Sequence, residues 1–281
     1  MINKRAAAKI NLSLDVCKKR DDGYHDIKTL MVMTNLCDDM KFSKSDKVSI
    51  TPEFDFPMEE NFIYKAYLKL KEYIGRDIPF NVQIEKNIPE AAGLAGGTSN
   101  GAATFYALNE LYKLNLKKEE LIELARPMGA DFTYMMTGGF ALATGIGDKL
   151  EALDDIYLKN VLLVNPGIKI STPEVYQKIK IKDERIDFDK VIKSLRDLNI
   201  DNLNRYMGNS MEEVVFSMHP EVKEIKHKII DMNGASLMSG SGSTVFGIFE
   251  NRSELDEAYS YFKEKYDLSF KTKAGGNYGS F

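Results

Sequence analysis

Cysteine, tryptophan and long apolar runs are scarce or absent in this sequence. Two of the 281 residues are cysteines, Cys17 and Cys37, so no disulfide framework is expected and a reduced, cytoplasmic setting fits best. The longest apolar stretches, such as residues 161–164, are far too short to span a bilayer. Residues 1–9 carry basic side chains but no apolar segment follows, so no signal peptide is predicted. These absences argue against a secreted miniprotein and against a membrane protein.

The sequence also lacks an excess of basic charge. Lysine and arginine number 38 against 42 aspartates and glutamates, a net charge of -4, whereas nucleic-acid binders usually show a basic excess. Hydrophobic residues make up 43% and charged residues 28%, as in a soluble globular protein. The length favours two domains, and the turn at 145–148 suggests domains 1–155 and 156–281. None of these values fixes the oligomeric state.

Alternation of apolar and polar residues predicts a half-buried strand over residues 8–16. Lys9 and Asn11 share the polar face of this strand. Apolar residues at helical spacing predict a helix over 63–74, with Gly75 as its stop. The other predicted elements are strands over 25–36, 80–86, 161–164 and 244–249, and helices ending at Leu111, over 117–128, within 178–201, from Pro220 to Asn233, and over 254–265.

Start signals support two of these helices. His219-Pro220 places a proline in a first helical turn, where its missing N–H is tolerated. Ser253 with Asp256 resembles a capping box at the start of the last helix.

A stretch rich in glycine and alanine, residues 89–100, lies between a predicted strand and a predicted helix. Small residues let a ligand approach the backbone, and successive N–H groups with a helix N-terminus offer positive dipoles suited to phosphate. No Gly-Lys-Ser/Thr follows, so this is not a Walker A loop, and Gly93, Gly96 and Gly97 lack the Rossmann spacing. The competing interpretation is a tight turn whose serine or threonine caps the next helix.

Asp131 follows Gly129-Ala130 and precedes an apolar, aromatic segment. One interpretation is a carboxylate that caps a helix. The other is a general base aimed at a substrate hydroxyl, for which a nearby cation would keep the carboxylate ionised. Lys9 is the candidate cation, and its competing interpretation is an ordinary solvated lysine.

A glycine-serine segment, residues 239–243, precedes the strongly apolar strand predicted at 244–249. A flexible linker is one interpretation of this composition. The adjoining apolar strand instead favours an ordered turn, whose glycines could approach a substrate or the phosphate site.

Together these segments resemble the GHMP kinase superfamily, which includes galactokinase and the homoserine, mevalonate and phosphomevalonate kinases. Its phosphate-binding signature, Pro-x-x-x-Gly-Leu followed by small residues up to a serine or threonine, is matched by residues 89–99. The closer match is to a branch of the superfamily in the non-mevalonate isoprenoid pathway, and it covers essentially the whole chain. The segments that carry it are 8–12, 22–25, 89–100, 165–176 and 238–246, with Asp22-Gly23-Tyr24-His25 as the most specific.

The resemblance implies a role for each matching residue. Asp131 is implied to be the catalytic aspartate and Lys9 the lysine that pairs with it. His25 is implied to read the edge of a cytosine ring, and Tyr24 and Tyr176 to sandwich that ring. The other implied substrate contacts are Asn11, near the erythritol end, and Thr172. The residues implied to bind ATP are Pro89, Glu90, Ala91, Ala92, Gly93, Leu94, Ala95, Gly96, Gly97, Thr98 and Ser99, and those implied to line the junction of the two domains are Gly240, Ser241, Gly242 and Ser243.

The resemblance also implies an α+β fold of two domains, with the active site in the cleft between them. The N-terminal domain is expected to be ribosomal-protein-S5-domain-2-like and the C-terminal domain a ferredoxin-like α/β sandwich. The implied reaction is ATP-dependent phosphorylation of the 2-hydroxyl of a cytidine diphosphate-linked methylerythritol, with ATP as co-substrate and Mg²⁺ expected. The superfamily usually continues after its aspartate with Val-Pro-Phe, whereas this chain has Phe132-Thr133-Tyr134.

Two other functions remain open on the sequence. One is a different small-molecule kinase of the superfamily, acting on mevalonate or homoserine. The other is a non-catalytic nucleotide-binding or sensor protein on the same fold, against which the presence of both Lys9 and Asp131 argues.

Overall fold

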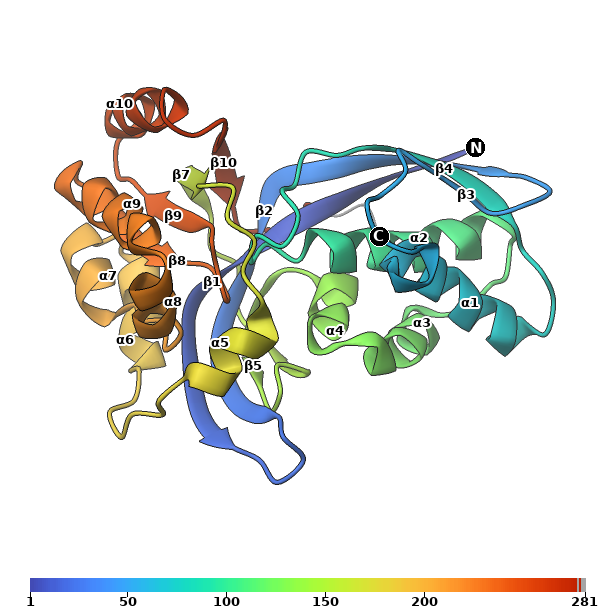
Figure 1. The fold of residues 1–281 in the computed structure, drawn as a ribbon, viewed down its shortest axis with the longest axis horizontal. Coiled ribbons are helices and arrows are strands. Elements are labelled where there is room, and N and C mark those ends of the chain that lie inside the picture. The colour runs from blue at the N-terminus through green and yellow to red at the C-terminus, as the bar shows by residue number, and fades with distance from the viewer. Residues whose placement is uncertain (277, 279–281) are drawn as a thin grey trace.

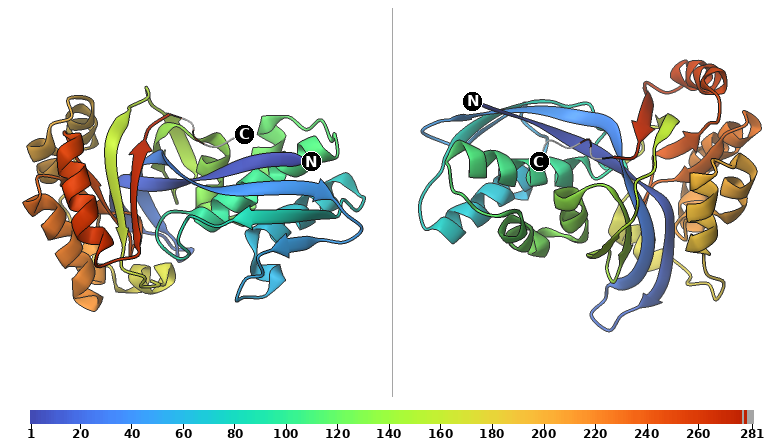
Figure 2. Two further views of the ribbon diagram at one scale, coloured as in Figure 1. Left: turned by 90° about the horizontal axis from the view of Figure 1, so that it is seen from above. Right: turned by 180° about the vertical axis from the view of Figure 1, so that it is seen from behind.

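The chain forms two groups of helices connected by long strands, as a computed structural model of residues 1–276 and 278 shows (Figure 1). The strands β1 (Ile2–Lys19) and β2 (His25–Lys44) form one antiparallel hairpin that runs along both groups (Figures 1 and 2). Both strands extend well beyond the predicted segments 8–16 and 25–36. The prediction that the first strand is half-buried is wrong, because residues 6–16 are all buried.

The N-terminal group packs helices against one face of the sheet around β2 (Figures 1 and 2). Its elements are β3 (Ser49–Thr51), the short 3-10 helix η1 (Met58–Glu60), α1 (Phe62–Ile74), β4 (Phe80–Glu85), α2 (Gly96–Leu111), α3 (Lys118–Ala125), the 3-10 helix η2 (Arg126–Met128), α4 (Ala130–Thr137), β5 (Phe140–Thr144) and β6 (Lys149–Ala152). Strands β4 and β5 each pair antiparallel with a different part of β2. Strand β3 pairs parallel with β4, and β6 pairs antiparallel with β5.

The C-terminal group packs most of its helices on the outer face of a second run of strands (Figure 1). Its elements are β7 (Leu158–Asn165), α5 (Thr172–Lys178), α6 (Phe188–Arg196), α7 (Ile200–Tyr206), α8 (Glu212–Met218), α9 (Pro220–Asp231), β8 (Ala235–Met238), β9 (Val245–Ile248), α10 (Arg252–Lys263) and β10 (Leu268–Ala274). The strand order is β10-β7-β9-β8, with every pairing antiparallel. Strand β10 joins this run to β2 through the pair Ala274 and Thr34.

One hydrophobic core crosses from one group to the other. Ile10 and Leu12 of β1 pack in a cluster with Val161 of β7, Leu237 of β8 and Phe246 of β9, all of them buried. The proposed division at residue 155 lies in the connection between β6 and β7. Because the core is shared, the two groups hold each other in place on either side of the strand that carries Lys9 and Asn11.

Local sequence signals account for several helix ends. Helix α1 stops at Gly75, which adopts the left-handed conformation expected of a terminal glycine, with φ of 68°. Helix α9 begins at Pro220 as predicted. The capping box at Ser253 is wrong, because α10 starts at Arg252, two residues before the predicted start, and its N-cap is Asn251 without a side-chain cap. Among residues 1–276 and 278, no helix has both the length and the apolar character needed to cross a membrane.

Candidate active site

A cavity of about 1010 Å³ is lined by residues from both groups and collects most of the predicted site residues. Its walls include Lys9 and Asn11 of β1, Asp131 of α4, and Tyr176 of α5. Of the residues implied to bind ATP, Pro89–Gly93 and Ala95–Thr98 also line it. Leu94, Ser99, Gly242 and Ser243 do not line it and are buried.

Lys9 places a buried ammonium group at the centre of the site. Its side chain is 5% exposed, and its Nζ donates to Asn11 Oδ1 at 2.6 Å and lies 3.9 Å from Asp131 Oδ2. Asn11 is in turn held by its own Nδ2, which donates to Thr29 Oγ1 at 2.8 Å. A buried cation is expensive unless it is paired and hydrogen-bonded, and both conditions are met here. The interpretation of Lys9 as a solvated lysine is therefore wrong.

Asp131 presents a partly exposed carboxylate to the cavity, with 42% of its side chain accessible. It lies in the first turn of α4, and the N-cap of that helix is Gly129, whose φ of 153° favours glycine. The interpretation of Asp131 as the N-cap is therefore wrong. The helix dipole favours an anion at this position. The unusual residues Phe132-Thr133-Tyr134 simply continue α4 inward, because Phe132 and Tyr134 are fully buried.

The backbone of the 89–99 loop follows a sequence of left-handed turns. Ala91, Gly93 and Ala95 have φ of 49°, 75° and 55°, and α2 begins directly after them. The N-cap of α2 is Ala95, which provides no side-chain cap, and Thr98 and Ser99 already lie inside the helix. The interpretation of this segment as a turn capped by serine or threonine is therefore wrong. The first N–H groups of α2 are consequently left for another acceptor.

The carbonyl groups of this loop have hydrogen-bond partners in the protein, whereas most of its N–H groups do not. Lys9 N donates to Leu94 O at 3.1 Å, Ser239 Oγ donates to Gly93 O at 3.0 Å, and Thr244 N donates to Ala92 O at 3.3 Å. Within the described residues, the backbone N–H groups of 90–95 donate to no protein acceptor. The loop thus turns its carbonyls toward the protein and keeps its donors free for an anion.

The other end of the cavity is aromatic. The rings of His25 and Tyr176 stack with centroids 4.9 Å apart and planes 19° apart, while Tyr24 is 62% exposed. His25 is nine-tenths buried, so its interpretation as a surface residue is wrong. Burial, and then the charge of Lys19, lowers the pKa of His25, which favours the neutral ring with one donor and one acceptor nitrogen. Because His25 covers one face of Tyr176, a second ring would have to use the opposite face.

The pKa of Tyr176 is raised to about 12, chiefly by burial and then by the charge of Asp131. Its phenol therefore stays protonated at neutral pH and can donate a hydrogen bond. Thr172, at the start of the same helix, shares a 2.7 Å hydrogen bond with Ser241, which ties α5 to the glycine-serine segment.

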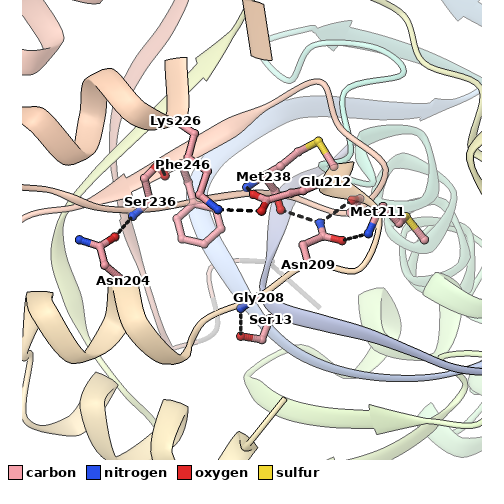
Figure 3. Close-up of polar contacts among 11 residues, drawn as sticks. Ser13, Asn204, Gly208, Asn209, Met211, Glu212, Lys226, Ser236, Met238 and Phe246 are labelled. Carbon is pink, nitrogen blue, oxygen red and sulfur yellow. Dashed lines mark hydrogen bonds and ion pairs between the residues drawn. The ribbon is translucent and has the colours of Figure 1, made fainter. Parts of the chain in front are cut away.

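The glycine-serine segment is an ordered, fully buried turn, so its interpretation as a flexible linker is wrong. Asn209 holds it from below, donating from Nδ2 to the carbonyls of Met238 and Gly240, both at 2.8 Å (Figure 3). Asn209 Oδ1 accepts from Met211 N at 2.9 Å, which fixes the orientation of the amide. The turn comes so close to the 89–99 loop that a Cβ on Gly93 would lie 2.2 Å from Ser239 O.

Neighbouring contacts extend this support. Glu212 accepts from Met238 N at 3.0 Å and from Lys226 Nζ at 2.7 Å (Figure 3). The segment before α8 also reaches β1, because Gly208 O accepts from Leu14 N at 2.9 Å. The turn is therefore locked to the strand that carries Lys9 and Asn11.

Sequence reasoning missed the residues that support the site. Thr29 and Asn209 are isolated polar residues, and no pattern marks them before their partners are known. Asp38 stands beside Asp39, beyond the strand predicted over 25–36, and no pattern distinguishes these two carboxylates from each other. Ser239, which contacts both Gly93 and Asn11, had been considered only as part of a turn.

Oxygen donors for a magnesium ion are present but do not form a cage. Glu90, Thr98 and Asp131 line the cavity. Among the described residues, no group of three or more acidic, histidine or cysteine side chains is arranged to hold a metal. This donor set fits Mg²⁺ in the way it usually accompanies nucleotides, bound mainly by phosphate oxygens and water with one or two carboxylates.

Comparisons with known proteins agree with this geometry. The chain matches the model of the GHMP kinases N terminal domain over residues 61–145 and that of the GHMP kinases C terminal domain over residues 191–268. A crystal structure of a homoserine kinase from Cytophaga hutchinsonii shares the fold, with a TM-score of 0.75 and 18% identity over 98% of this chain and 95% of its own. The α+β fold and the site thus define a kinase of the GHMP class, which uses ATP to phosphorylate a small molecule.

Relatives with higher sequence identity show which family of GHMP kinases this chain belongs to. The 4-diphosphocytidyl-2-C-methyl-D-erythritol kinase of Thermoanaerobacter pseudethanolicus is 40% identical over 97% of this chain and 96% of its own length. The enzyme of that name from Listeria monocytogenes is 37% identical over 92% of this chain and 91% of its own. A crystal structure of 4-(cytidine 5'-diphospho)-2C-methyl-D-erythritol kinase aligns with a TM-score of 0.85 and 29% identity, covering 98% and 100% of the two chains. This chain belongs to the family of 4-diphosphocytidyl-2-C-methyl-D-erythritol kinases.

Proposed function

We propose that this chain transfers the γ-phosphoryl group of ATP to the 2-hydroxyl of 4-diphosphocytidyl-2-C-methyl-D-erythritol, with Asp131 as base and Lys9 as its cationic partner. The hydroxyl oxygen forms a bond to the γ-phosphorus, and the bond from that phosphorus to the bridging oxygen of ADP breaks. Asp131 accepts the hydroxyl proton. The products are the 2-phosphorylated alcohol and ADP.

The observation that carries this proposal is the meeting of two features in one cavity. Lys9 pairs with the partly exposed Asp131 carboxylate, and the 89–99 loop offers free backbone donors beside them. Lys9 supplies positive charge beside Asp131, where the phosphoryl group is transferred. Positioning and electrostatics of this kind provide most of the rate in phosphoryl transfer.

The charge of the two substrates is balanced locally, since the chain as a whole is acidic. The free N–H groups of 90–95 and the start of α2 receive the ATP phosphates. Lys9, Lys19, Lys86 and Lys169 are the cavity-lining lysines that add charge. Glu90, Thr98 and Asp131 are the oxygen donors available to Mg²⁺, which supplies further charge neutralisation when bound with ATP.

The aromatic end of the cavity suits the cytosine ring. Tyr24 and the free face of Tyr176 offer stacking surfaces, and neutral His25 can pair with the donor and acceptor edge of the base. Asn11, whose Oδ1 accepts from Lys9, and Thr172, which lines the same cavity, are the other substrate contacts in this proposal. The division into domains 1–155 and 156–281 and the cytoplasmic location belong to this proposal as well.

Replacement of Asp131 by asparagine tests the base. The fold should persist, because this carboxylate is partly exposed and its one ion pair is 3.9 Å long. We expect kcat to fall by about 10²–10⁴-fold, the usual contribution of a positioned general base. A coupled assay of ADP release measures it, with melting temperature as the control for folding. Turnover close to that of the unchanged chain would refute the assignment.

Replacement of His25 by glutamine tests the recognition of the base. We expect a higher KM for the cytidine substrate with little change in the KM for ATP, because the ring lies at the end of the cavity away from the 89–99 loop. An effect on ATP alone would contradict the cytosine-reading role.

A further inference from the structure

Asp38 is a fully buried carboxylate at the base of the 89–99 loop, with 0% of its side chain exposed. Oδ1 accepts from the backbone N–H groups of Asn87 and Ile88 at 2.8 and 2.9 Å. Oδ2 accepts from Lys86 Nζ at 2.5 Å and from Asn100 Nδ2 at 2.9 Å. Four donors, one of them a cation, make this buried charge tolerable.

The position of Asp38 explains why a carboxylate is needed there. The ladder between β2 and β4 ends at the pair Asp39 and Glu85. Beyond that pair the chain leaves the sheet, and its next N–H groups have no strand to receive them. The carboxylate of Asp38 accepts the N–H groups of Asn87 and Ile88 in place of a strand. It thereby directs the chain into the loop.

The same carboxylate also holds the far end of the loop. Asn100 lies in the second turn of α2, directly after Ser99, and its amide both donates to Asp38 and accepts from Lys86 Nζ at 3.3 Å. Residues 86–88 and residue 100 are therefore fixed to one point, and the loop closes between them. Lys86 and Asn100 also line the cavity, so the same contacts set the position of the Lys86 ammonium.

We infer that Asp38 is a positioning residue for phosphoryl transfer, which holds both ends of the phosphate-binding loop and the Lys86 ammonium in place before ATP arrives. The inference rests on the proposed role of residues 89–99 in binding ATP. Asp38 does not reach substrate, because its side chain has no exposed surface. Its effect is preorganisation, since donors that are already aligned lose less freedom when the anion binds.

Replacement of Asp38 by asparagine breaks this arrangement with little change in volume. The new amide group faces two existing donors, Lys86 Nζ and Asn100 Nδ2, where the carboxylate accepted from both. We expect the Kd of the non-hydrolysable analogue AMP-PNP to rise at least about tenfold, while the Kd of cytidine diphosphate is unchanged. Calorimetry on the full chain measures both values without requiring turnover. Failure of the proposed reaction would therefore leave this binding test intact.

A second measurement covers a variant that is too unstable to titrate. Asn100→Ala removes the link to α2, together with the acceptor that Asn100 offers to Lys86 Nζ, and leaves Asp38 with three donors. Hydrogen exchange in the free protein should become faster over residues 86–100 and stay unchanged over residues 239–243. Because no ligand is present, a direct contact between Asn100 and ATP cannot produce this result.

Asp15→Asn is the matched control for the loss of a buried carboxylate. Asp15 is 6% exposed and pairs with Arg185 at 3.4 Å, on the part of β1 that lies away from the loop. We expect this control to lower the melting temperature but to leave the Kd of AMP-PNP unchanged. The inference is overturned if Asp38→Asn keeps the original affinity for AMP-PNP, or if Asn100→Ala leaves exchange over residues 86–100 unchanged.

Discussion

Two glycine-rich segments meet in this molecule, and they differ in exposure. Residues 239–243 are buried at every position, whereas Glu90, Ala91 and Gly97 of the 89–99 loop are exposed. Both consist mainly of small residues, so composition does not separate them. The difference lies in their hydrogen bonds. In the buried turn, Ser239 N and Gly242 N donate to neighbouring carbonyls and Asn209 donates to Gly240 O, whereas none of the N–H groups of 90–95 donates to an acceptor among the described residues. One segment forms a wall of the site, and the other is the anion-binding loop that we propose.

Each segment is held by one buried polar side chain, which we call its anchor. The anchor accepts hydrogen bonds where the segment offers N–H groups and donates them where it offers carbonyls. The chain entering the 89–99 loop offers N–H groups, and the carboxylate of Asp38 accepts them. The buried turn and the last residue of β8 offer carbonyls, and the amide of Asn209 donates to those of Gly240 and Met238 (Figure 3). A buried polar group without a partner costs about 1–3 kcal/mol, so each anchor is specific for its own segment.

The largest expected effect comes from Gly93→Ala, where the two segments touch. Its φ of 75° disfavours a side chain, and the new Cβ would lie 2.2 Å from Ser239 O. Strain and overpacking of this kind each cost about 1–3 kcal/mol, so the free energy of unfolding should fall by about 2–6 kcal/mol. Denaturant unfolding measures the change.

Gly97→Ala is the control for this substitution. Gly97 lies inside α2, and a Cβ there would make an ordinary 3.5 Å contact with Phe62. Its stability should stay the same or rise by up to about 1 kcal/mol, the helix preference of alanine over glycine. Equal losses in both variants would show that the close approach at Gly93 is unimportant.

An intermediate effect is expected from Asn209→Leu, which removes the anchor of the buried turn. Two carbonyls and the N–H of Met211 lose their partner, so unfolding should become easier by about 2–4 kcal/mol. Affinity for AMP-PNP should change much less than in Asp38→Asn, because the 89–99 loop keeps its own anchor. Asn202→Leu, the same change at an exposed position of α7, should stay within about 0.5 kcal/mol. A larger loss of AMP-PNP affinity in Asn209→Leu than in Asp38→Asn would reverse the roles assigned to the two anchors.

The smallest expected effect is on the pH dependence of stability, and it comes from His25 at the aromatic end of the cavity, which neither glycine-rich segment forms. Burial and Lys19 lower the pKa of His25 below its unfolded value of 6.5, so the folded chain favours the neutral ring. The corresponding stability is complete above pH 6.5 and is lost as the pH falls through the lowered pKa. In the variant His25→Gln, the loss of stability below pH 6.5 that His25 causes should disappear. The variant His227→Gln, which changes an exposed histidine, should still show that loss. Identical slopes for all three chains would contradict the burial effect.

Local patterns predicted elements well where neighbouring residues decide the structure. The helix ending at Gly75 and the helix beginning at Pro220 follow from turn chemistry that the sequence displays. The half-buried first strand was wrong for a long-range reason. The backbone N–H groups of Lys9 and Asn11 donate to Leu94 and Ser239, which are distant in sequence and close over this part of the strand.

The site itself was predictable mainly through resemblance to a known family. Spacing alone left Lys9 and Asp131 with ordinary interpretations, and the structure rejects those because it pairs a buried ammonium with a partly exposed carboxylate. The anchors Asp38 and Asn209 had no such guide. Their importance depends on which backbone groups lack partners, and only the three-dimensional structure shows that.

The most direct test of this account is ATP consumption by the purified chain with three alcohols in parallel. We predict ADP release with 4-diphosphocytidyl-2-C-methyl-D-erythritol and rates at least about 100-fold lower with mevalonate or homoserine, because only the first fills the aromatic end of the cavity. Comparable turnover of mevalonate or homoserine would contradict the account, as would tight binding of ATP and the cytidine substrate without any phosphoryl transfer.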